Sequence, residues 1–97
     1  MILQRICVRH KPGCGEAVIA FLKASRAHMN EPENMRILKP KIGVSQNTIV
    51  YELINKDLEE NQREWQAWLS RPETPSLLER WDQLVLDWSD EYWEVEI

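Results

Sequence analysis

The chain has 97 residues, of which 43% are hydrophobic and 29% are charged, a length and composition typical of one globular domain spanning residues 1–97. Its formal net charge is −4, whereas a protein that binds a phosphate backbone needs an excess of basic residues. No apolar run approaches the roughly 20 residues of a membrane-spanning helix. We therefore expect neither a nucleic acid nor a membrane as a partner.

The N-terminus and the two cysteines bear on where the protein resides. The first residues alternate in character and include Arg5 and Arg9, unlike the continuous apolar core of a signal peptide. Without a secretory signal, Cys7 and Cys14 are expected to be reduced thiols in the cytoplasm. No second Cys or His lies at ligand spacing to either cysteine, so the sequence predicts no metal site and no cofactor.

The first third of the chain predicts a strand and a helix. Apolar and partly polar side chains alternate from Ile2 to Arg9, which leaves both faces of this strand substantially apolar. Lys11-Pro12-Gly13 ends the strand, and an amphipathic pattern predicts a helix from about Cys14 to His28. Because two apolar faces need two covers, we expect helices on one face and the sheet of a second subunit on the other.

The middle of the chain predicts a hairpin. Residues Met35 to Ile42 form its first strand, and Pro40 within it favours an edge position or a bulge because proline lacks a backbone donor. Residues 43–47 form the loop. The stretch from Thr48 to Ile54 is rich in β-branched and aromatic residues and is the clearest strand in the sequence.

Two helices and a final strand are expected in the last part of the chain. Asp57 is placed to cap a helix that stops near Arg71-Pro72, and Thr74 is placed to cap a second helix whose apolar stripe continues to Trp88. The first of these helices has an expected inner face made of Leu58, Gln62, Trp65 and Leu69. The final strand is expected to point its alternating apolar residues inward, namely Trp93, Val95 and Ile97.

The resulting order is β-α-β-β-α-β with a split second helix, which is the ferredoxin-like α+β pattern. Several short runs also resemble the NIPSNAP-like branch of the dimeric α+β barrel proteins. They are Lys11-Pro12-Gly13, the run from Ile37 to Gly43, the run from Asn47 to Glu52, Trp65, Trp68, Arg71-Pro72-Glu73 and the helix through Trp81. The resemblance implies a homodimeric α+β barrel, with a cavity between the sheet and the helices of each subunit.

Aromatic residues are the candidates for a binding site. The chain has five tryptophans, and a wall of tryptophans with a few polar groups is typical of a pocket for a flat, apolar or aromatic small molecule. Tryptophans at helical spacing, such as Trp65, Trp81 and Trp88, are more often plain core. The predicted ligand-binding residues are Gln4, His10, Trp65, Trp68 and Trp81.

The resemblance leaves three functions open. They are a homodimeric ligand-binding protein or enzyme with a small hydrophobic substrate, a cofactor-independent monooxygenase of the antibiotic-biosynthesis type, and a non-catalytic dimerisation module. Haem-degrading relatives place a histidine on the helix after the second main helix, and residues 74–88 contain none, so haem is not expected. No residue is assigned a catalytic role.

Overall fold

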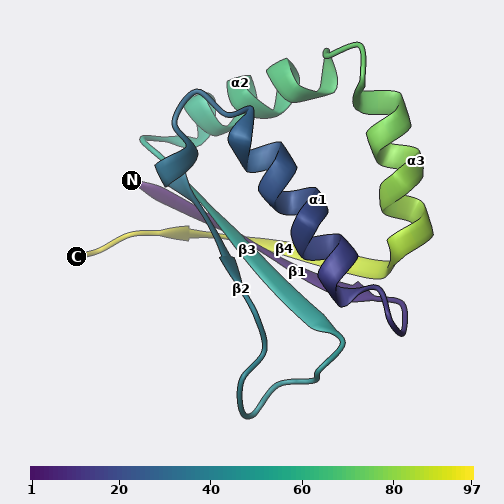
Figure 1. Cartoon of the computed structure of the whole chain (residues 1–97). Helices are drawn as coiled ribbons and strands as arrows, with labels where there is room; N and C mark the ends of the chain where they lie inside the picture. The colour runs from purple at the N-terminus through teal and green to yellow at the C-terminus, as the bar shows by residue number, and fades with distance from the viewer.

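The computed structural model describes residues 1–97 and has the predicted ferredoxin-like α+β architecture, including the split second helix (Figure 1). A short 3₁₀ turn, η1, precedes the second strand. The elements in chain order are β1 (Ile2–His10), α1 (Gly15–Ala27), η1 (Pro32–Asn34), β2 (Met35–Leu38), β3 (Thr48–Asn55), α2 (Leu58–Leu69), α3 (Thr74–Leu84) and β4 (Val85–Glu94). None of the helices is long and apolar enough to cross a membrane.

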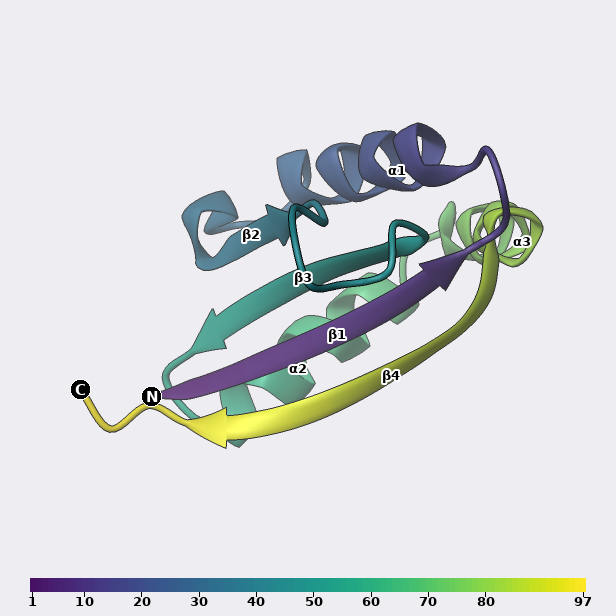
Figure 2. The same ribbon diagram turned by 90° about the horizontal axis from the view of Figure 1, so that it is seen from below.

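The four strands form one antiparallel sheet in the order β2-β3-β1-β4. Of the edge position and the bulge expected for the second strand, the edge position is confirmed, although Pro40, the residue that suggested it, lies beyond the end of β2. All the helices lie on one side of the sheet, and the face turned toward the viewer in Figure 2 carries no helix. We call these the helix face and the open face. The two ends of the chain lie side by side, since the Val95 backbone N–H donates to the Met1 carbonyl at 2.9 Å.

The core fills the space between α1 and the helix face of the sheet. On β1, even-numbered residues such as Ile6 and Val8 are buried there, while Cys7 and Arg9 are exposed on the open face, as the two-residue period of a strand requires. Phe21 of α1 and Trp81 of α3 join the two helices above the sheet, with ring centroids 5.2 Å apart. The buried apolar residues are Ile6, Val8, Val18, Ile19, Leu22, Met35, Ile49, Leu84 and Val85.

The start of α2 is capped as predicted. The Asp57 carboxylate accepts a hydrogen bond from the Glu60 backbone N–H at 2.9 Å. Asp57→Ala is expected to lower the free energy of unfolding by about 1 kcal/mol because it leaves that donor without its partner. Urea denaturation measures the change. Asp57→Asn keeps the acceptor and is the matched control, and equal stability of the Ala variant and the wild type would contradict this role.

The boundary between α3 and β4 was predicted wrongly. The helical stripe was expected to continue to Trp88, but the helix ends at Leu84 and the strand begins at the next residue. The Lys11 backbone N–H donates to the Leu84 carbonyl at 2.9 Å, and β4 then pairs with β1 along its length. Strand pairing with β1 therefore overrides the helical periodicity of this segment.

Three other details of the sequence prediction are also wrong. The second strand ends at Leu38 rather than Ile42. Helix α3 begins at Thr74 itself, and the Thr74 hydroxyl donates to the Trp68 carbonyl at the end of α2 instead of capping α3. Trp93 points to the open face, opposite Leu3, and is 53% exposed; Val95 and Ile97 follow the strand.

Candidate functional site

A buried glutamine is the centre of a polar cluster between α2 and the helix face. Gln4 on β1 is 3% exposed. Its Oε1 accepts hydrogen bonds from Asn61 Nδ2 at 3.0 Å and from Trp65 Nε1 at 2.8 Å, and its Nε2 donates to Asp90 Oδ2 at 3.2 Å. Two donors on one side and a carboxylate on the other fix the orientation of the Gln4 amide. Gln4 thus connects α2 with the edge strand β4.

The cluster continues through a second amide. Asn61 Nδ2 also donates to Asn55 Oδ1 at 2.9 Å, and Asn55 Nδ2 donates to Glu64 Oε2 at 2.9 Å. The Tyr92 hydroxyl donates to Asn61 Oδ1 at 3.4 Å. No buried side-chain nitrogen or oxygen lacks a partner, so every buried polar group of the cluster is satisfied. We call it the Gln4 network: Gln4, Asn55, Asn61, Glu64, Trp65, Asp90 and Tyr92.

Partly exposed aromatic surface borders the network. Trp65 and Trp68 on α2 are half-buried and stand edge to face, with ring centroids 6.1 Å apart. On β4, Trp88 and Tyr92 lie opposite Val8 and Gln4, which places them on the helix face. They are 57% and 43% exposed. Polar groups in fixed positions beside aromatic walls are the usual composition of a small-molecule site.

Burial and the nearby Asp90 carboxylate both act on two tyrosines of this region. Burial, and then the charge of Asp90, raise the pKa of Tyr51 and of Tyr92 above the ordinary value for a phenol. Tyr51 lies opposite Ile6, which in turn lies opposite Asp90, so all three share one row of the helix face. Both tyrosines therefore remain neutral hydrogen-bond donors at ordinary pH.

The predicted site residues fall into two groups. Gln4, Trp65 and Trp68 lie together at the network, whereas His10 lies at the far end of β1, about 20 Å from Gln4 at the usual rise of a strand. His10 is buried, with Nδ1 2.8 Å from the Lys11 carbonyl oxygen and its ring against Gly15. Trp81 packs on Phe21 of α1.

Several members of the network were not predicted. The inner face of α2 was expected to carry Leu58 and Leu69, but these are 51% and 49% exposed, while Asn61 is 1% exposed. Asn61 precedes Trp65 by one helical turn and so shares its face. That spacing is the signal that was available in the sequence. Residues not predicted for the site are Asn55, Asn61, Glu64, Asp90 and Tyr92.

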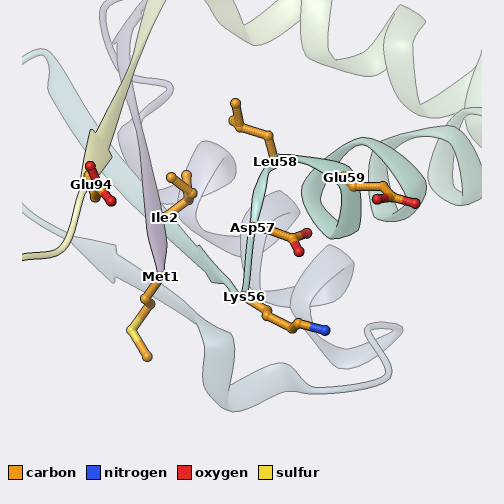
Figure 3. Close-up of a pocket in the computed structure, with 7 residues that line it drawn as sticks. All are labelled: Met1, Ile2, Lys56, Asp57, Leu58, Glu59 and Glu94. Atoms are coloured by element: carbon orange, nitrogen blue, oxygen red, sulfur yellow. The ribbon is translucent and has the colours of Figure 1, made fainter.

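Two surface hollows are lined by residues outside the network. The larger, of about 450 Å³, is bounded by the N-terminus, the end of β4 and the start of α2, and Glu94 stands across it from the acidic groups Asp57 and Glu59 (Figure 3). The smaller, of about 240 Å³, lies between α3 and the start of β4 and includes Trp81 and Trp88. No cluster of three or more His, Cys, Asp or Glu residues is placed to hold a metal ion.

The open face is crossed by a row of charged side chains, which we call the charged row: Arg36, Glu52, Arg5 and Glu91. Glu52 is 1% exposed, and its two carboxylate oxygens accept from Arg5 Nε at 2.7 Å and from Arg36 Nε at 2.5 Å. Burial alone would raise the pKa of Glu52, but the hydrogen bonds and charges of the two arginines outweigh it and lower that pKa. Apolar side chains flank the row, with Leu3 opposite both Ile54 and Trp93.

Solved structures share this fold. No protein-family model matches the sequence, and no curated protein matches it significantly. A NIPSNAP family protein from Agrobacterium tumefaciens superimposes with a TM-score of 0.81 at 10% identity, covering 96% of this chain and 90% of that one. Another from the same organism, of unknown function, has a TM-score of 0.80 at 16% identity, covering 98% and 87%.

A third structure is an uncharacterised NIPSNAP-like domain protein from Burkholderia xenovorans. It has a TM-score of 0.77 at 16% identity and covers 97% of this chain and 84% of its own. The similarity extends over almost the whole of each chain, and at these identities it is a similarity of fold. The chain therefore has the ferredoxin-like α+β fold of the solved NIPSNAP family proteins.

Proposed function

We propose that the chain is a homodimeric NIPSNAP-like protein that binds a small, flat, largely apolar molecule between α2 and the sheet. The observation that carries the proposal is the Gln4 network, which holds the Trp65 indole by a 2.8 Å hydrogen bond beside partly exposed aromatic surface. Flat ligands bind well against such surface because aromatic rings bury a large area in fixed geometry.

The polarity of the network supports a role in binding. Gln4 and Asn61 are 3% and 1% exposed, and amides buried at such positions contribute little net stability compared with apolar side chains of similar shape. A small domain also has little core to spare for polar groups. A polar cluster at this place, beside half-buried Trp65 and Trp68, is therefore better accounted for by recognition of a ligand than by packing.

The open face supports the homodimer. It carries no helix (Figure 2), and Leu3, Ile54 and Trp93 form an apolar group at one end of it. The molecule is flattened, with extents of 36 × 35 × 19 Å. A face of that breadth is large enough to supply the roughly 800 Å² that each partner buries in a stable interface. A second copy of the sheet is the occupant that fits such a surface.

Quenching of tryptophan fluorescence tests the ligand. The probes are 2,3-dimethyl-1,4-naphthoquinone, whose blocked ring positions prevent addition of the exposed Cys7 thiol, and the flavonoid quercetin. We expect saturable quenching by both after correction for light absorption by the probe. Trp65→Phe should weaken binding about tenfold, because it removes the indole donor and part of the wall. Trp93→Phe, on the open face of the sheet, is the matched control and should bind as the wild type does.

Haem is the probe for the contrary outcome. Tight one-to-one binding of haem with a shifted Soret band would contradict the proposal, as would quenching that Trp65→Phe leaves unchanged. Oxygen uptake on addition of quercetin that requires the protein would instead support the alternative function, a cofactor-independent monooxygenase.

A further inference from the structure

Three residues of β4 form an unusual stripe beside the Gln4 network. Trp88, Asp90 and Tyr92 alternate along the strand and lie opposite Val8, Ile6 and Gln4, all of which are buried on the helix face. The three stripe residues themselves are exposed, because β4 is the edge strand of the sheet. We call them the β4 stripe. It presents a carboxylate between two large aromatic rings on the side of the sheet that holds Trp65.

Asp90 differs from its neighbours in lacking a cationic partner. Asp87 and Glu91, on the open face of the same strand, pair with Arg9 and Arg5 respectively. Asp90 forms no ion pair and accepts one hydrogen bond, from Gln4 Nε2 at 3.2 Å. A carboxylate offers about four acceptor positions, and because Asp90 is exposed, most of them face solvent, where a ligand can reach them. The Gln4 amide holds this carboxylate in place, and the opposite side of the same amide holds the Trp65 indole.

The spacing of the stripe suits a cation. Alternate residues of a strand lie about 7 Å apart, so a group seated over Asp90 is within reach of both neighbouring rings. Aromatic faces attract cations within about 6 Å of the ring centroid, and a carboxylate adds direct charge attraction. The negative charge of Asp90 also acts on neighbouring side chains, since together with burial it raises the pKa of both Tyr51 and Tyr92.

We infer that the site selects flat ligands that carry a positively charged nitrogen, with the ring system against Trp65 and the nitrogen over Asp90 between Trp88 and Tyr92. This inference rests on the proposed function and adds the charge class of the ligand to it. The stripe is separate from the proposed dimer surface, because it lies on the opposite face of the sheet from Trp93.

A pair of probes of nearly equal shape tests the charge. They are 1-methylquinolinium, a cation, and 1-methylnaphthalene, its neutral counterpart, and calorimetric titration measures the affinity of each. We expect the cation to bind about tenfold more tightly to the wild type. Asp90→Asn keeps an acceptor for Gln4 and removes the charge, and it should abolish the preference. Glu33→Gln removes the same charge from η1, at the β2 side of the sheet, and should leave the preference intact.

Each outcome separates this inference from the function on which it rests. Equal affinity of the two probes, or a preference that survives in Asp90→Asn, overturns the charge selection and leaves binding at Trp65 standing. Failure of both probes to bind at concentrations up to their solubility limits also overturns it, and the naphthoquinone titration then tests the proposed function on its own. A preference lost in both Asp90→Asn and Glu33→Gln would show a general charge effect and would overturn the assignment to Asp90.

Discussion

Replacing both Arg5 and Arg36 with methionine is expected to lower the free energy of unfolding by about 2–3 kcal/mol. The Glu52 carboxylate, 1% exposed, would then be buried without either of its partners. Breaking a fully buried ion pair costs about 3–5 kcal/mol. The expected value here is smaller because, in the single chain, the side chains of Arg5 and Arg36 are 39% and 69% exposed and solvent screens their charges. Chemical denaturation at fixed protein concentration measures the change.

The matched control removes the buried charge as well. Adding Glu52→Leu to the double variant should recover most of the lost stability. Three apolar side chains then replace the two arginines and the glutamate, and no buried charge is left without a partner. In the wild type the pKa of Glu52 is lowered on folding. The ion pairs therefore stabilise the fold fully above the unfolded-state pKa of about 4.3, and this stability is lost as pH falls through the lower folded-state value. A double variant as stable as the wild type, or a triple variant no better than the double, would contradict this account of the charged row.

Trp93→Ala is expected to dissociate the homodimer. Trp93 is 53% exposed on the open face, opposite Leu3, where a second sheet would cover it. Large aromatic residues that become buried in an interface and act as hot spots contribute about 2 kcal/mol or more, equivalent to at least 30-fold in the dissociation constant. Light scattering coupled to size exclusion at micromolar concentration should give about twice the 11.5 kDa chain mass for the wild type and a mass near that of one chain for the variant.

The control for that experiment lies on the same strand. Trp88 is 57% exposed on the opposite, helix face, so Trp88→Ala removes an aromatic of equal size without touching the proposed interface. We expect it to stay dimeric. A monomeric wild type would contradict the homodimer itself. Loss of the dimer in Trp88→Ala but not in Trp93→Ala would place the interface on another surface.

Local sequence patterns were sufficient for the order of the elements but not for the last boundary. The alternation of β1, the β-branched run of β3 and the Asp57 cap each carry their signal within a few residues. At the end of α3 the apolar helical spacing continues into Val85 and Trp88, which belong to β4. Only pairing with β1, which is distant in sequence, turns that segment into a strand. The pairing also shifts register between Arg9 and His10, which no local pattern in the sequence indicates.

The site was predictable only in part, for a related reason. Tryptophans are conspicuous in any sequence, so Trp65 and Trp68 were found, and Gln4 was found by its place on the first strand. Asn61 was missed because asparagine in a helix is normally exposed, and its burial depends on partners far away in sequence. Asp90 was missed because its face of the sheet follows from the register of β4, which the sequence does not display.

The indole N–H signals of a ¹⁵N-labelled sample provide the most direct test that the ligand binds on the helix face. Each of the five tryptophans contributes one such signal, and single Trp→Phe variants assign them. On addition of 2,3-dimethyl-1,4-naphthoquinone, the account predicts that the Trp65 signal, from the N–H bonded to Gln4, shifts with saturation, while the Trp93 signal on the open face stays in place. A shift of Trp93 with Trp65 unchanged, or no shift of either, would contradict the account.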